Sequence, residues 1–229
     1  MCNITKKTDR EIRDDVLAEL NYDPSVKITD IGVLVSDGIL TLNGVATSYD
    51  RKLNAVNTAK RVAGVRAIAD EIKVKLPDSL TRTDGDIASA VTEEIKWRTS
   101  IPIGVVQVMV REGWITLEGQ VEWQYQKEAA EDTVRYLPGV NGVSNAITIK
   151  CKATSKATET AKEIEISIKA AFDRSALLDA ERIGVETVGS KVILRGRARN
   201  HAEREEAERV AWAAEDVGSV DNELIVEHP

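Results

Sequence analysis

Histidine and cysteine, the side chains that most often carry metal or nucleophilic chemistry, are scarce in this sequence. It holds two of each, Cys2, Cys151, His201 and His228. His201 and Glu203 form an H-x-E pair, but a zinc deaminase needs a paired-cysteine motif as well, and the sequence has none. P-loop, nucleophile-elbow, H-E-x-x-H and C-x-x-C motifs are also absent. We therefore expect no enzymatic activity, no metal site and no cofactor.

Basic side chains alternate over one short stretch of the chain. Arg195, Arg197 and Arg199 follow Lys191, and strand alternation places all four on the outward side of one strand and its exit. Such a row can bind anionic headgroups or phosphate. The alternative is that the glutamates of the following helix balance the row. Those glutamates are Glu203, Glu205, Glu206 and Glu208.

Composition indicates a globular, water-soluble protein. The 229 residues are 42% hydrophobic and 30% charged, which supplies both a core and a solvated surface. No apolar run reaches the roughly 18 residues of a transmembrane helix, and the first seven residues contain no apolar segment of a signal peptide. We expect a cytoplasmic protein, or a periplasmic one if the native N-terminus was truncated. The net charge of -7 argues against nucleic-acid binding.

One eight-residue pattern occurs three times. It covers Asp37–Gly44 and Glu112–Gly119, and it returns more loosely at Gly189–Gly196, so the spacings are 75 and 77 residues. Extending these spacings without a gap gives three units. We predict a tail at 1–7, domains at 8–75, 83–150 and 160–227, and linkers at 76–82 and 151–159.

Each unit has the same succession of patterns. A helical stripe such as Ile12, Val16 and Leu20 precedes an alternating strand, a tight turn and a second alternating strand. An alanine-rich helix and a last strand follow, so the order is αββαβ. We predict an α+β protein in which two helices cover one face of a small three-stranded mixed sheet in each unit. Trp97 follows the stripe of its helix and is predicted to lie in the core, like Tyr22 in the first unit.

The opposite sheet face has no predicted cover. In the second unit it presents Met109 and Trp114, which we interpret as a candidate contact surface for a partner or for a neighbouring unit. Gly44, Gly119 and Gly196 end the second strand of each unit, and we interpret them as structural glycines with positive φ or a close helix approach.

Short glycine motifs at the ends of the later helices have a structural interpretation. Gly64 and Gly139, each followed by valine, are typical of glycines that terminate a helix. Residues 139–142 also form a G-x-x-G, the loop with which KH domains clamp a nucleic-acid backbone. That loop would have to join two helices, whereas here it joins a helix to a strand, so we interpret it as a turn.

The combined pattern resembles the BON domain, named for bacterial osmotically inducible and nodulation proteins. The resemblance rests on three paired positions at the second strand, on the Gly-Val pairs and on the ending of each last strand. The first of these sets comprises Leu42 with Gly44, Leu117 with Gly119, and Leu194 with Gly196. The endings are Asp70-x-Ile72-x-Val74, Asn145-x-Ile147-x-Ile149 and Asn222-x-Leu224-x-Val226. The third unit departs from the pattern, with Asp216 in place of the glycine before Val217.

The resemblance implies a non-catalytic binding module that attaches to phospholipid surfaces and is linked to osmotic or envelope stress. For this chain the expected contacts are the surface around Met109 and Trp114, with the strand from Lys191 to Arg199 as the electrostatic candidate for an anionic phospholipid surface. The alternative is a cytoplasmic adaptor that self-associates or binds another protein and never touches lipid.

Overall fold

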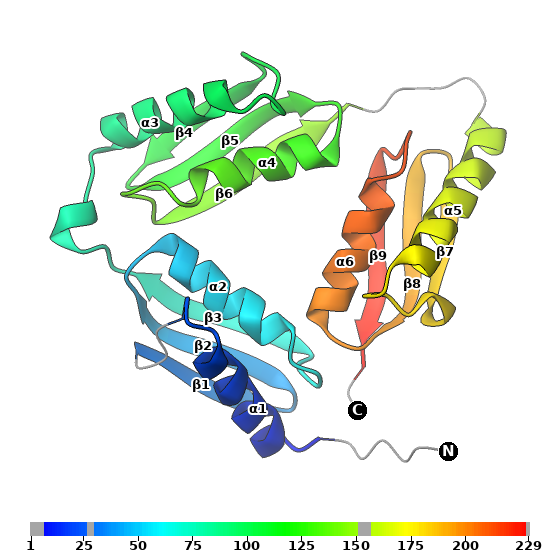
Figure 1. Cartoon of the computed structure of the whole chain (residues 1–229), viewed down its shortest axis with the longest axis horizontal. Coiled ribbons are helices and arrows are strands. Elements are labelled where there is room, and N and C mark those ends of the chain that lie inside the picture. Colours follow the sequence, from blue (N-terminus) through cyan, green and yellow to red (C-terminus); the bar gives the residue numbers. More distant parts are fainter. Residues whose placement is uncertain (1–6, 27–29, 151–156, 228–229) are drawn as a thin grey trace. The chain divides into compact units, whose positions relative to one another are not determined.

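The computed structural model describes residues 7–26, 30–150 and 157–227. In each repeat, which we call a module, an αββαβ succession forms one small sheet with its helices (Figure 1). Module 1 contains α1 (Asp9–Tyr22), β1 (Ile31–Ser36), β2 (Ile39–Ala46), α2 (Tyr49–Lys60) and β3 (Ala67–Val74). Module 2 contains α3 (Asp84–Trp97), β4 (Val106–Arg111), β5 (Trp114–Val121), α4 (Gln124–Val134) and β6 (Gly142–Ile149). Module 3 contains α5 (Ala157–Arg174), β7 (Ile183–Val188), β8 (Lys191–Ala198), α6 (His201–Trp212) and β9 (Ser219–Val226).

In each sheet the second strand of the module along the chain lies in the centre. The strand orders are β1-β2-β3, β4-β5-β6 and β7-β8-β9. In modules 2 and 3 the central strand is antiparallel to the strand before it and parallel to the strand after the second helix. Both helices of a module lie on the same face of its sheet (Figure 1). The predicted α+β class, with three mixed sheets and their helices, is confirmed.

The helical stripes pack where their spacing predicts. Ile12, Val16 and Leu20 of α1 are fully buried, and so are Ile168 and Val91 at matching places in α5 and α3. On the sheets, buried side chains alternate with exposed ones, which is why each central strand supplies two core residues from one face. Those pairs are Leu40 and Leu42, Ile115 and Leu117, and Val192 and Leu194.

The predicted burial of Trp97 is wrong. Trp97 is 79% exposed and Tyr22, its counterpart in module 1, is 85% exposed. Each follows the last residue of the stripe by two positions, and two residues turn a helix by about 200°. Trp97 therefore points away from the face that Ile87 and Val91 bury, although it comes directly after the stripe in the sequence.

Three element boundaries differ from the predicted ones. Helix α5 begins at Ala157, inside the predicted linker, because the alanine, glutamate and lysine residues from there on favour a helix. The α-helices before Gly64 and Gly139 end at Lys60 and Val134, four or five residues earlier than predicted, and single turns with i→i+3 hydrogen bonds fill the gap. The 76–82 segment contains a short 3₁₀ helix, η2 (Asp78–Leu80).

The tight turns between the first two strands have the expected geometry, and a carboxylate from the first helix binds them. Asp37 and Gly38 both have positive φ, 51° and 73°, as a two-residue hairpin of type I′ requires. The Asp9 carboxylate accepts hydrogen bonds from both of their N–H groups, at 2.8 and 2.9 Å. Asp84 binds the turn of module 2 in the same way. Thr8 and Thr83 are the N-caps of α1 and α3, and the aspartates after them bind the hairpin turn.

Candidate binding faces

The face of each sheet that carries no helix is called its open face, and its side chains follow from the strand registers. In module 2 three rows cross the sheet. Arg111 lies opposite Trp114, Met109 opposite Thr116, and Gln107 opposite Glu118. Met109 is 64% exposed and Trp114 is 53% exposed. Both predicted contact residues therefore stand on the open face, in adjacent rows.

Trp114 owes its orientation to a glycine on the neighbouring strand. Gly142 pairs with Trp114 in the parallel register, and a Cβ atom added at Gly142 would lie 2.3 Å from the Trp114 ring. The indole therefore lies across β6, a position that any larger residue at 142 would prevent. The absence of a side chain at Gly142 thus leaves the space in which the Trp114 ring packs. The G-x-x-G that contains it forms a turn between α4 and β6, as predicted.

The open face of module 1 carries a group of exposed apolar side chains. Leu34 of β1 is 60% exposed, and Ile39 and Val45 of β2 are 47% and 41% exposed. Ala67 of β3 occupies the position that Gly142 has in module 2 and is also exposed. Isolated exposed apolar side chains are ordinary, but here three of them share one side of adjacent strands.

The open face of module 3 is charged, and its charges pair with one another. Arg195 lies between Glu186 and Glu223, with N···O distances of 2.6 and 2.8 Å. Hydrogen bonding to Glu223 and the charges of both glutamates raise the pKa of Arg195 above its usual value. Lys191 pairs with Asp221 at 3.0 Å.

The next arginine along β8 is also paired. Arg197 contacts Glu227 at 3.3 Å, and Glu227 binds Arg182 as well. The predicted row of basic side chains therefore exists on β8. The partners of Lys191, Arg195 and Arg197 are carboxylates of β7, β9 and the residue that follows β9. Arg199 alone pairs with one of the helix glutamates considered as the alternative, Glu203. The open face consequently has little net charge.

Arg199 does not belong to this row. Strand β8 ends at Ala198, and the Arg199 guanidinium pairs with Glu203 at 3.0 Å and donates to the Leu177 carbonyl. Glu203 is buried and also accepts from the backbone N–H groups of Arg199 and Asp179. Burial opposes ionisation of Glu203, but the hydrogen bonds from Arg199 outweigh it and lower the pKa of the carboxyl below its usual value. This ion pair joins Arg199, which precedes α6, to the first turn of that helix.

The H-x-E residues do not converge on a common ligand. His201 begins α6, whereas the Glu203 carboxylate is held by Arg199 and Asp179. Among residues 7–26, 30–150 and 157–227, no group of three metal-ligating side chains is close enough to hold an ion. The two cysteines and His228 lie outside the described residues. Within the same ranges no helix is both long and apolar enough to cross a membrane.

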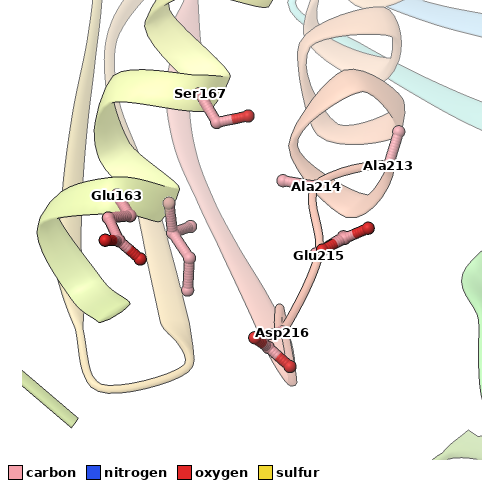
Figure 2. A pocket seen from close by; sticks show the side chains of 7 residues that line it. Glu163, Ser167, Ala213, Ala214, Glu215 and Asp216 are labelled. Atoms are coloured by element: carbon pink, nitrogen blue, oxygen red, sulfur yellow. The ribbon is translucent and has the colours of Figure 1, made fainter. Parts of the chain in front are cut away.

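A pocket of about 370 Å³ lies between α5 and the segment that follows α6 (Figure 2). Its walls include Ile164, Ala214 and the carboxylates of Glu163, Glu215 and Asp216. Asp216 has a φ of 62° and so takes the left-handed conformation that Gly64 and Gly139 have at the same place. At Gly139 an added Cβ would lie 2.9 Å from Ile87, so module 2 packs tightly there. We attribute the pocket to the looser packing around Asp216.

The glycines that end the second strands have positive φ, 129° at Gly44, 149° at Gly119 and 128° at Gly196. The close approach at two of them is to the carbonyl of the residue just before the first strand of the module, rather than to one of the two α-helices. A Cβ at Gly119 would lie 2.3 Å from the Val105 carbonyl oxygen, and one at Gly196 would lie 2.1 Å from that of Arg182. These glycines let the first two strands meet where the chain leaves the sheet.

Three small αββαβ modules, each with one covered and one open sheet face, define a protein built from one repeated folding unit. The chain belongs to the BON domain family, whose model matches residues 8–75, 83–151 and 160–228.

A curated relative is the osmotically-inducible protein Y of Escherichia coli strain K12. It is 32% identical over 148 residues, which cover 62% of this chain and 73% of the relative. Two solved structures of CdsD, a structural protein of the type III secretion system of Chlamydia trachomatis, align at 11% and 12% identity. They cover 93% and 97% of this chain and 91% and 100% of theirs, with TM-scores of 0.26 and 0.25.

Proposed function

We propose that this chain is a non-catalytic binding protein of the osmotic stress response that attaches to phospholipid surfaces through its apolar open face in module 1. The observation that carries the proposal is the grouping of Leu34, Ile39 and Val45 on one uncovered side of β1 and β2. Membership of the BON family and the osmotically inducible relative support the physiological setting.

In this proposal the apolar contact, rather than the arginine strand, supplies the free energy of membrane binding. Lys191, Arg195 and Arg197 each have a carboxylate within 3.3 Å, so they offer an anionic headgroup little uncompensated charge. Each aliphatic side chain that leaves water for the acyl region gains about 1 kcal/mol or more. Three such side chains give weak, reversible attachment. The anionic preference expected from the arginine row has no support in these ion pairs.

The test is liposome flotation of the full chain with zwitterionic vesicles. The variant Leu34→Glu/Ile39→Glu places two charges on the apolar open face, and we expect it to abolish flotation. Arg195→Gln/Arg197→Gln is the matched control on module 3, because it changes two exposed side chains at the same face of a homologous sheet. Unchanged flotation of the module 1 variant, or no flotation of the wild type with any vesicle, would refute the proposal.

The compartment is part of the same proposal. We place the protein in the cytoplasm, on the composition of the sequence, with the periplasm as the alternative. Fractionation of cells that express the untagged protein separates the two, because osmotic shock releases only periplasmic contents. Release of the protein by shock would refute the cytoplasmic placement without touching the lipid proposal.

A further inference from the structure

Two opposite charges stand at opposite ends of the open face of module 2, and neither is paired. Arg111 lies in the row of Trp114, and Glu118 lies two rows away, with the row of Met109 and Thr116 between them. Four residues along β5 separate the two end rows, which is about 13 Å in a strand. Within the described part of the chain, no hydrogen bond or ion pair joins either charged side chain to another residue.

This pattern is self-complementary for one arrangement only. If a second copy packs its open face of module 2 on the first with its strands reversed, a two-fold axis runs along the row of Met109 and Thr116. The rotation brings the Arg111 row over the row that holds Glu118 of the partner subunit. Because the axis is two-fold, the complementary charge contact forms twice. A parallel arrangement would instead bring arginine to arginine.

The apolar groups occupy the positions that this arrangement needs. Met109 sits on the axis, 64% exposed, and would contact the partner's Met109. Trp114, spread over Gly142, presents the flat, half-exposed ring that commonly anchors protein interfaces. The small residues Ser144 and Ala146 of β6 leave room for a facing ring.

We propose that the open face of module 2 binds the same face of a second copy of this chain in the antiparallel arrangement, with Arg111 against Glu118 of the partner subunit. The other modules lack the pattern. The positions of Arg111 and Glu118 are Ser36 and Asn43 in module 1 and Val188 and Arg195 in module 3. Module 2 is therefore the module that associates. This interaction goes beyond the proposed function and does not depend on it.

The size of the face sets the strength of association. A three-stranded face about six residues long covers roughly 20 by 15 Å, well below the about 800 Å² per partner that stable complexes bury. We therefore expect a weak dimer that sedimentation velocity detects with the full chain between about 20 μM and about 1 mM.

Charge reversal provides the decisive test. Arg111→Glu and Glu118→Arg each create two repulsive contacts in the dimer, and we expect each to weaken association about tenfold or more. An equimolar mixture of the two variants restores both attractive contacts and should dimerise like the wild type. Arg10→Glu on α1 changes the net charge as Arg111→Glu does, but it lies away from the face. It should leave dimerisation unchanged.

A second variant distinguishes loss of the interface from loss of the fold. Met109→Lys places two like charges, one from each copy, against one another on the axis, and should abolish dimerisation while circular dichroism stays unchanged. The proposal is overturned by a wild type that stays monomeric up to about 1 mM. It is equally overturned by reversal variants that dimerise normally, or by a mixture that sediments as monomers. Sedimentation contains no lipid, so its outcome is independent of the flotation result.

Discussion

The Asp84 carboxylate shows how one residue can join two elements that are distant in sequence. It begins α3 and accepts hydrogen bonds from the Glu112 and Gly113 N–H groups, both at 2.9 Å. Two N–H groups of a tight turn are thereby satisfied by an anion at a helix start, where negative charge is also favourable. A helix cap such as Thr83 can be recognised from local spacing, because its partner Asp86 follows three residues later. A bond across 28 residues has no local spacing to reveal it.

We expect Asp84→Ala to lower the free energy of unfolding of module 2 by about 1–3 kcal/mol, because two N–H groups, the exposed one of Glu112 and the part-buried one of Gly113, lose a charged acceptor. Urea unfolding followed by tryptophan fluorescence measures this, since three of the four tryptophans, at 97, 114 and 123, belong to module 2. Asp132→Ala, which removes a surface ion pair with Arg135, is the control and should cost under about 0.5 kcal/mol. Equal effects of the two variants would contradict the proposed role of Asp84.

Glu203 makes the stability of module 3 depend on pH. Its pKa is lower in the folded protein than its ordinary value of 4.5, so the unfolded chain binds the proton more readily. The stability that the Arg199 pair supplies is complete above about pH 4.5 and is lost as the pH falls through the folded pKa.

Glu203→Gln should therefore destabilise module 3 at pH 7 by about 1–3 kcal/mol, and the difference from the wild type should shrink at acid pH. Gln126 occupies this position in module 2, where its Oε1 atom accepts the N–H groups of Glu122 and Trp123, so glutamine fits the site. Hydrogen exchange resolved to peptides of module 3 measures the effect. A difference that is constant with pH would show that the ion pair contributes nothing.

At the scale of elements, the ends of the second helices test how the repeats diverged. Asp216 adopts a φ of 62° and places a negative charge just after α6, and both features are unfavourable. Asp216→Gly should raise the stability of module 3 by about 0.5–1 kcal/mol. Asp216→Asn removes only the charge and should give a smaller gain. The reverse change, Gly139→Asp, should destabilise module 2 strongly, because a Cβ there lies 2.9 Å from Ile87.

The alternation of the strands and the helical stripes were predictable because both repeat over several turns or residues. The partners of buried polar groups were not. Thr58 and Thr133 occupy equivalent positions, yet the Thr58 hydroxyl donates to the Asp23 carboxylate, while the Thr133 hydroxyl accepts from Arg98. Asp23 and Arg98 are themselves equivalent and of opposite charge. A hydroxyl serves either sign, so one threonine pattern conceals two different contacts.

The recurring polar residue of the last strand binds local backbone in modules 2 and 3. The Asn145 amide donates to the Lys127 carbonyl at 2.8 Å, and the Asn222 amide donates to that of Arg204 at 3.0 Å. A lone polar side chain on the inward side of a strand needs such a partner.

At the scale of the whole molecule, three copies of one fold present three different open faces. One has a group of exposed apolar side chains, one carries tryptophan, methionine and an opposite charge at each end, and one is an internally paired set of ions. The sequence located these faces through strand alternation. It could not show that the arginines of module 3 are neutralised, because their partners lie up to 30 residues away on neighbouring strands.

The net charge of -7 gives the lipid proposal a sign test. If attachment is apolar, anionic vesicles repel the protein, and added salt screens that repulsion. We expect flotation with anionic vesicles to increase between about 20 mM and about 300 mM salt. A cationic patch would produce the opposite trend, since salt would weaken its attraction to the membrane. A decrease with salt would therefore return the arginine strand to consideration.

The parallel last strand has a consequence for how the chain is synthesised. Because β6 pairs with β5 only after α4 has been made, no sheet is complete until the end of its own repeat leaves the ribosome. Modules 1 and 2 share roughly 20 identical positions. The early hairpin of module 2 can therefore accept β3 of module 1, unless module 1 has already closed. Synthesis from the N-terminus closes it first, and refolding of the full-length chain from denaturant loses that order and permits strand exchange between the repeats.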